Sequence, residues 1–264
     1  KPNLTVYATK NMNNERITNL ANPTNGQDAA TKTYVDVLLA KIKGLEAREE
    51  ANLILNGFVD RRDGYNYKVV KIGNQLWIDE NLKYLPSVVG AATGDQSAPF
   101  YYVYGYNGTS VTDAKATENY AKYGVLYNWP AAMAGSAPSW SNPSLVQGVC
   151  PAGWHLPSDA EWTQLTDYLG GEAVAGGKLK DKEITFWKTP NTGATDETGF
   201  TALPGGYRFW SGSFQEITTE GYWWSATGAS SDASLRRQMI YGTGAVYKST
   251  NRKESGMSVR CIKD

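Results

Sequence analysis

The spacing of apolar residues predicts a long helix near the start of the chain. Four apolar residues recur at alternating intervals of three and four, the a/d pattern of a coiled coil: Val35, Leu38, Ile42 and Leu45. Asp28 can cap this helix and Gly57 can end it, so residues 28–57 form a predicted helical stalk. A helix over residues 29–56 would be about 42 Å long. Because a solitary helix would leave its apolar stripe in water, we expect it to pack against copies of itself. The alternative is a single helix lying against the following domain.

The residues before this helix have a different character. Residues 1–27 are polar and rich in asparagine, with too few apolar residues to form a core. Asn22 before Pro23 and Asn25 before Gly26 are turn signals. This pattern predicts an extended, turn-containing segment that leads into the helix.

The remaining residues, 58–264, contain local signals for short strands and for short helices. Residues 63–78 alternate in polarity around a Gly-Asn turn, as a β-hairpin does. Ser158 and Glu161 form a capping box that begins a predicted helix ending at Leu169.

The stretch 207–252 has neither helical nor strand periodicity as a whole. Residues that suit a folded core lie within it and after it. Trp223 and Trp224 suit a large core anchor, and Ser258–Ile262 suits a closing strand. Between these landmarks the chain is rich in the residue types that binding loops favour. We therefore predict a display region, a single solvent-facing patch distal to the helix. Its candidate ligand-binding residues are Phe209, Trp210, Gln215, Glu216, Thr218, Tyr222, Ser230, Asp232, Leu235, Arg237, Met239, Tyr241, Tyr247 and Thr250.

Composition and charge argue against two classes of partner. The 26 acidic side chains balance the 26 basic ones, whereas nucleic-acid-binding domains carry a basic excess. No apolar run approaches the roughly 20 residues that span a bilayer, so no membrane insertion is expected. Nine Trp, 17 Tyr and 27 Gly favour short strands and loops over a helical domain.

Two cysteines and one histidine are the remaining candidates for site chemistry. Cys150 and Cys261 cannot build a four-ligand zinc site, even with His155. The two thiols either pair, closing a long loop, or pack as small apolar groups. No nucleophile motif surrounds His155, so we expect a structural, hydrogen-bonded histidine. We predict no catalytic residue, metal ion or cofactor, and no enzymatic activity.

One short run points to a specific kind of stalk. Residues 16–36, RITNLANPTNGQDAATKTYVD, resemble the repeat of phage tail fibres in which a turn leads into a trimeric helix. The resemblance implies a homotrimer in a virion, joined to upstream tail-fibre or baseplate proteins and assembled in the host cytoplasm.

A second set of motifs covers about 200 residues. In chain order these motifs are DGYNY (63–67), IGNQLW (72–77), ENL (80–82), YGVLYNW (123–129), CPAGWHLPSDAEW (150–162), GFTALPGGYR (199–208), WWS (223–225) and GMSVRC (256–261). The order and the residues of these motifs resemble the Fibrobacter succinogenes major paralogous domain, a module related to the C-type-lectin fold. The resemblance implies an α+β, C-type-lectin-like domain in which the two ends pair and Cys150 bonds Cys261. The calcium-site signatures of sugar-binding lectins are absent, so the resemblance carries no metal site.

Relatives of this domain on phage fibres are similar to the variable proteins of diversity-generating retroelements, which mutate a C-terminal cassette. The resemblance implies a receptor-binding tip of a phage tail fibre that adheres to a bacterial surface protein or polysaccharide through a diversified surface over residues 207–252. The alternative is a cell-surface adhesin or fimbrial-tip domain of a bacterium. An oxidase of the formylglycine-generating type shares the broad fold and would need a reactive pair of Cys150 and Cys261.

Overall fold

The structure describes most of the chain from residue 32 onward, together with two residues before it. This computed structural model describes residues 24, 30, 32–183 and 185–264. Apart from Thr24, the predicted extended segment 1–27 lies outside these residues, as does the predicted Asp28 cap. The chain divides into two compact units, Lys1–Asn52 and Leu53–Asp264.

The predicted stalk helix is present as α1 (Lys32–Asn56). It ends as predicted at Gly57, whose positive φ of 67° is a backbone conformation that favours glycine and whose N–H donates to Leu53 O. The a/d stripe is exposed in the single chain: Ile42 is 49 % and Leu45 64 % accessible. Neither α1 nor any other helix in the described ranges has the length and hydrophobicity that a bilayer span requires.

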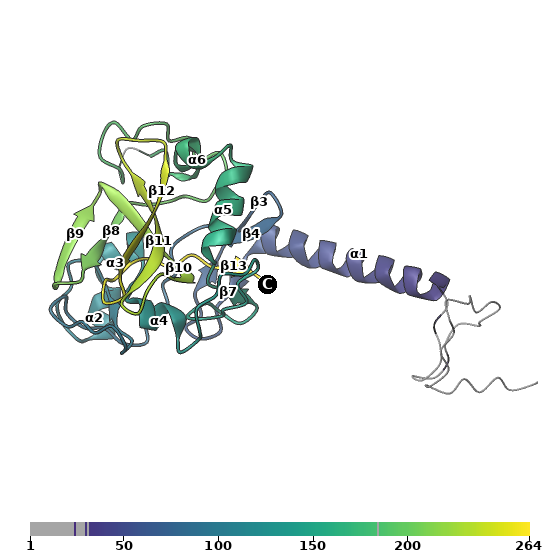
Figure 1. The fold of residues 1–264 in the computed structure, drawn as a ribbon, viewed down its shortest axis with the longest axis horizontal. Helices are drawn as coiled ribbons and strands as arrows, with labels where there is room; N and C mark the ends of the chain where they lie inside the picture. The colour runs from purple at the N-terminus through teal and green to yellow at the C-terminus, as the bar shows by residue number, and fades with distance from the viewer. Residues whose placement is uncertain (1–23, 25–29, 31, 184) are drawn as a thin grey trace, which may run out of the picture. The chain divides into compact units, whose positions relative to one another are not determined.

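A four-stranded antiparallel sheet joins the two ends of the larger unit (Figure 1). Its strands, in spatial order, are β3 (Val69–Ile72), β4 (Gln75–Ile78), β13 (Ile262–Lys263) and β7 (Trp154–His155). The predicted hairpin is confirmed over residues 69–78 as the β3–β4 pair, whereas Asn66–Tyr67 of the predicted range pair with Phe58–Val59. The predicted closing strand over 258–262 is wrong in its extent, because only its last residue joins this sheet while Ser258 bridges Trp223 elsewhere.

A five-stranded sheet contains most of the predicted display region. Its spatial order is β12 (Val246–Arg252), β11 (Ala233–Ile240), β10 (Glu220–Gly228), β8 (Gly205–Phe209) and β9 (Ser213–Ile217). β8 and β10 pair in parallel, and the other neighbours are antiparallel. The region is therefore mainly β-sheet rather than loop. Its strand period is obscured in the sequence because β10 is buried on both faces.

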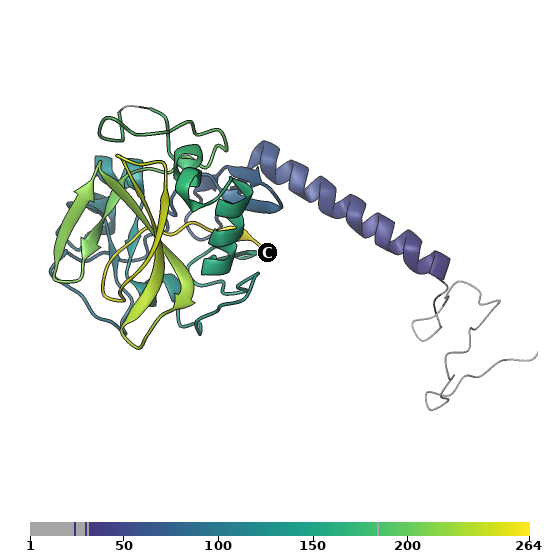
Figure 2. The same cartoon turned by 45° about the horizontal axis from the view of Figure 1, so that its top comes forward.

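Short helices and two small ladders complete the unit. They are α2 (Val111–Lys115), α3 (Glu118–Tyr123), α4 (Trp129–Met133), α5 (Asp159–Tyr168), α6 (Glu172–Leu179), the β1–β2 ladder (Phe58–Val59 with Asn66–Tyr67) and the β5–β6 ladder (Tyr101–Tyr102 with Leu126–Tyr127). The predicted capping box of α5 is confirmed, with caps at Ser158 and Leu169. α5 and α6 pack against β10, β11 and β12 (Figure 2).

Consecutive tryptophans of β10 anchor two separate cores. Trp223 lies with Trp162 and Met239 in the core beneath α5, whereas Trp224 belongs to the core on the other side of the strand. Both indole nitrogens are satisfied: Trp223 donates to Asn81 Oδ1 and Trp224 to a backbone carbonyl, each over 2.8 Å. The predicted burial of both tryptophans is confirmed. Because β10 is covered on both sides, it is the central strand of the fold.

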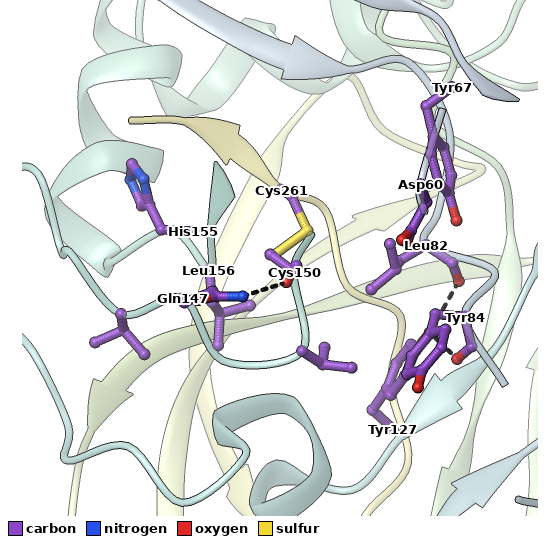
Figure 3. The surroundings of a disulfide bond; sticks show 12 residues. Asp60, Tyr67, Leu82, Tyr84, Tyr127, Gln147, Cys150, His155, Leu156 and Cys261 are labelled. Carbon is purple, nitrogen blue, oxygen red and sulfur yellow. Dashed lines mark hydrogen bonds between the residues drawn. A yellow bond between two sulfur atoms is a disulfide. The ribbon is translucent and has the colours of Figure 1, made fainter. Parts of the chain in front are cut away.

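The two cysteines form a disulfide (Figure 3), with a Cα–Cα distance of 5.9 Å. Cys150 precedes β7 and Cys261 precedes β13, so the bond reinforces the pairing of these strands. The pairing implied by the sequence resemblance is confirmed. Both residues are fully buried.

The single histidine lies between two carboxylates. Each nitrogen of the buried His155 ring is 2.7 Å from an oxygen, Nε2 from Glu161 and Nδ1 from Asp264. Burial lowers the pKa of His155, but the hydrogen bonds and charges of the two carboxylates outweigh burial, so its pKa lies above the usual value. When protonated, the histidine ties the start of α5 to the C-terminal strand.

A candidate binding face on the five-stranded sheet

The structure divides the fourteen predicted display residues by burial. Trp210, Glu216, Thr218, Ser230, Asp232, Tyr247 and Thr250 are exposed, and Phe209, Gln215 and Tyr241 are half-buried. The expectation of a solvent-facing position is wrong for four residues, which are buried: Tyr222, Leu235, Arg237 and Met239.

Three of these four face the helices. Side chains alternate along β11, so Leu235, Arg237 and Met239 point to one side of the sheet. Met239 enters the core beneath α5. The Arg237 guanidinium donates to Asp159 over 2.7 Å and to Glu172 over 2.5 Å. Arg237 and Met239 are parts of the scaffold, because each lies between the sheet and a helix, and Leu235 is buried on the same side of the strand.

The exposed members do not form the single patch that was predicted. Ser230 and Asp232 lie in the turn between β10 and β11. Thr218 and Tyr241 lie at the opposite ends of the same two strands. The nine residues of β10 separate these groups by about 26 Å at roughly 3.3 Å per residue. Only the residues on the sheet face between the two groups can contact one compact ligand.

That face carries four aromatic rings in continuous contact, which we call the aromatic arc: Tyr222, Tyr207, Phe209 and Trp210. The Tyr207 centroid lies 4.5 Å from that of Tyr222 and 6.0 Å from that of Phe209. The Phe209 centroid lies 5.5 Å from that of Trp210. Trp210 is 41 % exposed, whereas Tyr222 is the buried end of the arc. These separations are those of favourable aromatic pairs.

An arginine covers each end of the aromatic arc. The Arg236 guanidinium carbon lies 4.8 Å from the Tyr222 centroid, and that of Arg252 lies 4.4 Å from the Trp210 centroid. Within the described residues neither guanidinium has a carboxylate oxygen within 4.0 Å. Arg236 donates to Gln238 Oε1 over 2.7 Å, and its buried Nε has no hydrogen-bond partner in the same part of the chain.

A hydrogen-bond network fixes the middle of the face. The Glu220 carboxylate accepts hydrogen bonds from the Tyr222 hydroxyl and the Gln238 amide. Burial, and then the hydrogen bond and charge of Glu220, raise the pKa of the Tyr222 hydroxyl, so it remains a donor at neutral pH. Tyr247 lies directly opposite Gln238 in the ladder and so joins this face.

Sequence reasoning missed several contributors to this face, namely Tyr207, Glu220, Arg236, Gln238 and Arg252. One pattern in the sequence could have identified Arg236 as a residue of this face. Leu235 and Met239 bracket Arg237 at intervals of two, which assigns Arg237 to the buried side of a strand and Arg236 to the other side.

A hollow of about 570 Å³ borders the turn that carries Trp210. Its lining comprises residues 89–93, Asn107, Thr109 and residues 212–214. None of these side chains carries a charge. Phe214 contributes one aromatic wall and stacks on Tyr104 with centroids 5.0 Å apart.

The described residues contain no group of three or more His, Cys, Asp or Glu side chains arranged to hold a metal ion.

Comparison with known proteins identifies one family. The model of the family described as the Fibrobacter succinogenes major domain matches residues 70–263. No curated protein and no solved structure matches the chain. The matched segment contains the four-stranded sheet from Val70 onward, both cysteines and the whole binding face.

Proposed function

The chain belongs to the Fibrobacter succinogenes major domain family, and from this premise we propose that it is a receptor-binding protein, the tip of a phage tail fibre. It adheres to a bacterial surface receptor through the sheet face that carries the aromatic arc. One observation carries the proposal: four contacting rings, with Trp210 41 % exposed, lie under two guanidiniums that have no carboxylate partner among the described residues. Exposed aromatic and arginine clusters are typical of interaction sites.

The proposed assembly is a homotrimer held by α1. The exposed a/d stripe supports it, because its apolar side chains are 39–64 % accessible in the single chain: Val35, Leu38, Ile42 and Leu45. The resemblance of residues 16–36 to a tail-fibre repeat supports a location in the virion, joined to upstream tail-fibre or baseplate proteins.

We further propose that the larger unit is C-type-lectin-like and that its binding face is diversified. The pairing of β4 with β13 supports the first point, since the two ends of that fold pair. Backbone ladders hold β8 to β12 in place, while their outward side chains are free to change without removing a ladder hydrogen bond. The variable positions in this proposal exclude the four buried residues, Tyr222, Leu235, Arg237 and Met239.

The alternative of an oxidase receives no support from the thiols. A reactive pair must be accessible to substrate and to a metal, whereas Cys150 and Cys261 are fully buried in a disulfide. The burial of this disulfide favours a binding protein over an oxidase that uses these two thiols.

Adsorption to bacterial cells tests the proposed function. The variant Phe209→Ser with Trp210→Ser removes two rings of the arc. The matched control, Trp140→Ser with Tyr168→Ser, removes two aromatic residues outside the arc that are 65 % and 66 % exposed. The purified full chain is screened against a panel of candidate host cells, and Tm is measured for each variant. We expect both variants to keep their Tm and only the arc variant to lose adsorption. Equal adsorption of the arc variant and the wild type would contradict the proposal.

A further inference from the structure

The hollow that borders the β8–β9 turn has the size and lining of a ligand subsite. Its volume of about 570 Å³ falls in the range of roughly 300–1,000 Å³ that is common for small-molecule sites. It lies between the segment 89–93, two residues of the following loop and the turn between β8 and β9. Gly212 of the lining is two residues from Trp210 in this turn. Phe214 lies opposite Arg208 in the β8–β9 ladder, so it faces away from Tyr207 and Phe209.

Several polar groups in the hollow are available to a ligand. The Oδ1 atom of Asn107 accepts a hydrogen bond from the Ala91 N–H over 3.1 Å, which fixes the orientation of the side-chain amide. The NH₂ group of this amide can therefore donate to an acceptor on a ligand. Across the described ranges, no protein group hydrogen-bonds the Asn107 Nδ2 or the hydroxyls of Thr93 and Thr109. These groups are neutral, and the hydroxyls both donate and accept.

Charge in this area does not call for an ionic ligand. The hollow has no charged lining. On the face of the aromatic arc, the guanidiniums of Arg236 and Arg252 are accompanied by the carboxylate of Glu220. A strongly acidic or basic ligand would therefore meet like charge as well as opposite charge along this surface.

Hydroxyls, an amide and aromatic rings together match one ligand chemistry. Sugar hydroxyls exchange hydrogen bonds with Asn and Thr side chains and accept from guanidinium N–H groups. The apolar faces of sugar rings pack on aromatic side chains such as Phe214 and Trp210. A protein ligand would instead need a well-packed, desolvated pocket for an apolar anchor, whereas Thr93, Asn107 and Thr109 line this hollow and are exposed.

We propose that the hollow is a subsite for an uncharged sugar unit of a bacterial surface polysaccharide, whose neighbouring units pass Trp210 in the β8–β9 turn. This inference rests on the proposed receptor-binding function and commits it to a neutral glycan rather than a protein.

Two substitutions in the lining test the subsite, Ala92→Trp and Thr109→Val, and Ala229→Trp is the control. Ala92→Trp places a large side chain at an exposed position of the lining, and Ala229→Trp makes the same change at an exposed position in the β10–β11 turn. Thr109→Val removes a hydroxyl and keeps the shape of the side chain. We expect Ala92→Trp to reduce binding at least tenfold, Thr109→Val to reduce it by about two- to tenfold, and Ala229→Trp to leave it unchanged.

The probes are arrayed oligosaccharides of neutral hexoses, the same array of uronic acids, and host cells treated with periodate or with protease. The full chain should bind a neutral oligosaccharide, with affinity nearly constant between 50 and 500 mM NaCl as screening theory requires for an uncharged ligand. Adsorption should be lost after periodate and kept after protease. Binding confined to uronic acids, adsorption sensitive only to protease, or no effect of Ala92→Trp overturns the inference.

The outcomes separate this inference from the proposed function. If the arc variant loses adsorption while Ala92→Trp keeps it, the face binds the receptor and the hollow does not. If Ala92→Trp loses adsorption while the arc variant keeps it, the sugar subsite stands and the arc is not the receptor site.

Discussion

Replacing Arg237 should destabilise the fold, although the sequence pattern suggested a variable surface position. Arg237 is fully buried and contacts Asp159 at 3.1 and 2.7 Å, Thr163 at 2.8 Å and Glu172 at 2.5 Å. The variant Arg237→Ala leaves the Asp159 carboxylate, whose side chain is 9 % exposed, without its main partner.

The expected loss of unfolding free energy depends on the contacts that Asp159 and Glu172 keep after the substitution. Removing one partner of a buried ion pair costs about 3–5 kcal/mol. Asp159 keeps Lys248 at 2.6 Å, and Glu172 is 48 % exposed and can return to water. We therefore expect a loss near the lower limit, about 3 kcal/mol, which lowers Tm by roughly 6–12 °C in a domain of this size.

Calorimetry and urea unfolding of the full chain measure this loss, with Arg252→Ala as the exposed control that should change stability by less than about 0.5 kcal/mol. The double variant Arg237→Ala with Asp159→Ala should lose less than the sum of the two single losses, because the residues are coupled. A loss below about 1 kcal/mol for Arg237→Ala would refute the assignment of Arg237 to the scaffold.

Three further predictions concern other parts of the molecule. Because the pKa of His155 is raised in the fold, the stabilising effect of the protonated histidine should be full below about pH 6.5 and should fade as pH rises through the folded pKa. The difference in unfolding free energy between wild type and His155→Gln, measured from pH 5 to 9, should therefore become smaller as pH rises. A difference that stays constant with pH would contradict this prediction. Replacing Cys150 and Cys261 together by Ser should cost up to about 4.7 kcal/mol in urea unfolding, since the bond spans 111 residues, and an unchanged midpoint would count against a formed disulfide. Ile42→Glu with Leu45→Glu should convert a trimer into monomers in light scattering, and a monomeric wild-type chain would rule out the proposed stalk.

Local signals in the sequence were sufficient for several elements. The a/d spacing predicted α1, the capping box predicted α5, and alternation around a Gly-Asn turn predicted the β3–β4 hairpin. Each depends on residues only a few positions apart, so the chain itself contains the whole signal. The motif resemblance added the disulfide partner and the family, which local patterns cannot supply.

The binding face was decided by tertiary structure. Arg236 and Arg237 are adjacent and chemically identical, yet one stacks on Tyr222 of the aromatic arc and the other is buried against α5 and α6. Alternation along a strand shows only that neighbours point to opposite faces, and packing determines which face a helix covers. The arc combines residues of β8, its turn and β10, and the hollow adds segments more than a hundred residues earlier. No periodicity along the chain encodes such contacts, because they arise only when the sheet and loops assemble around the two cores.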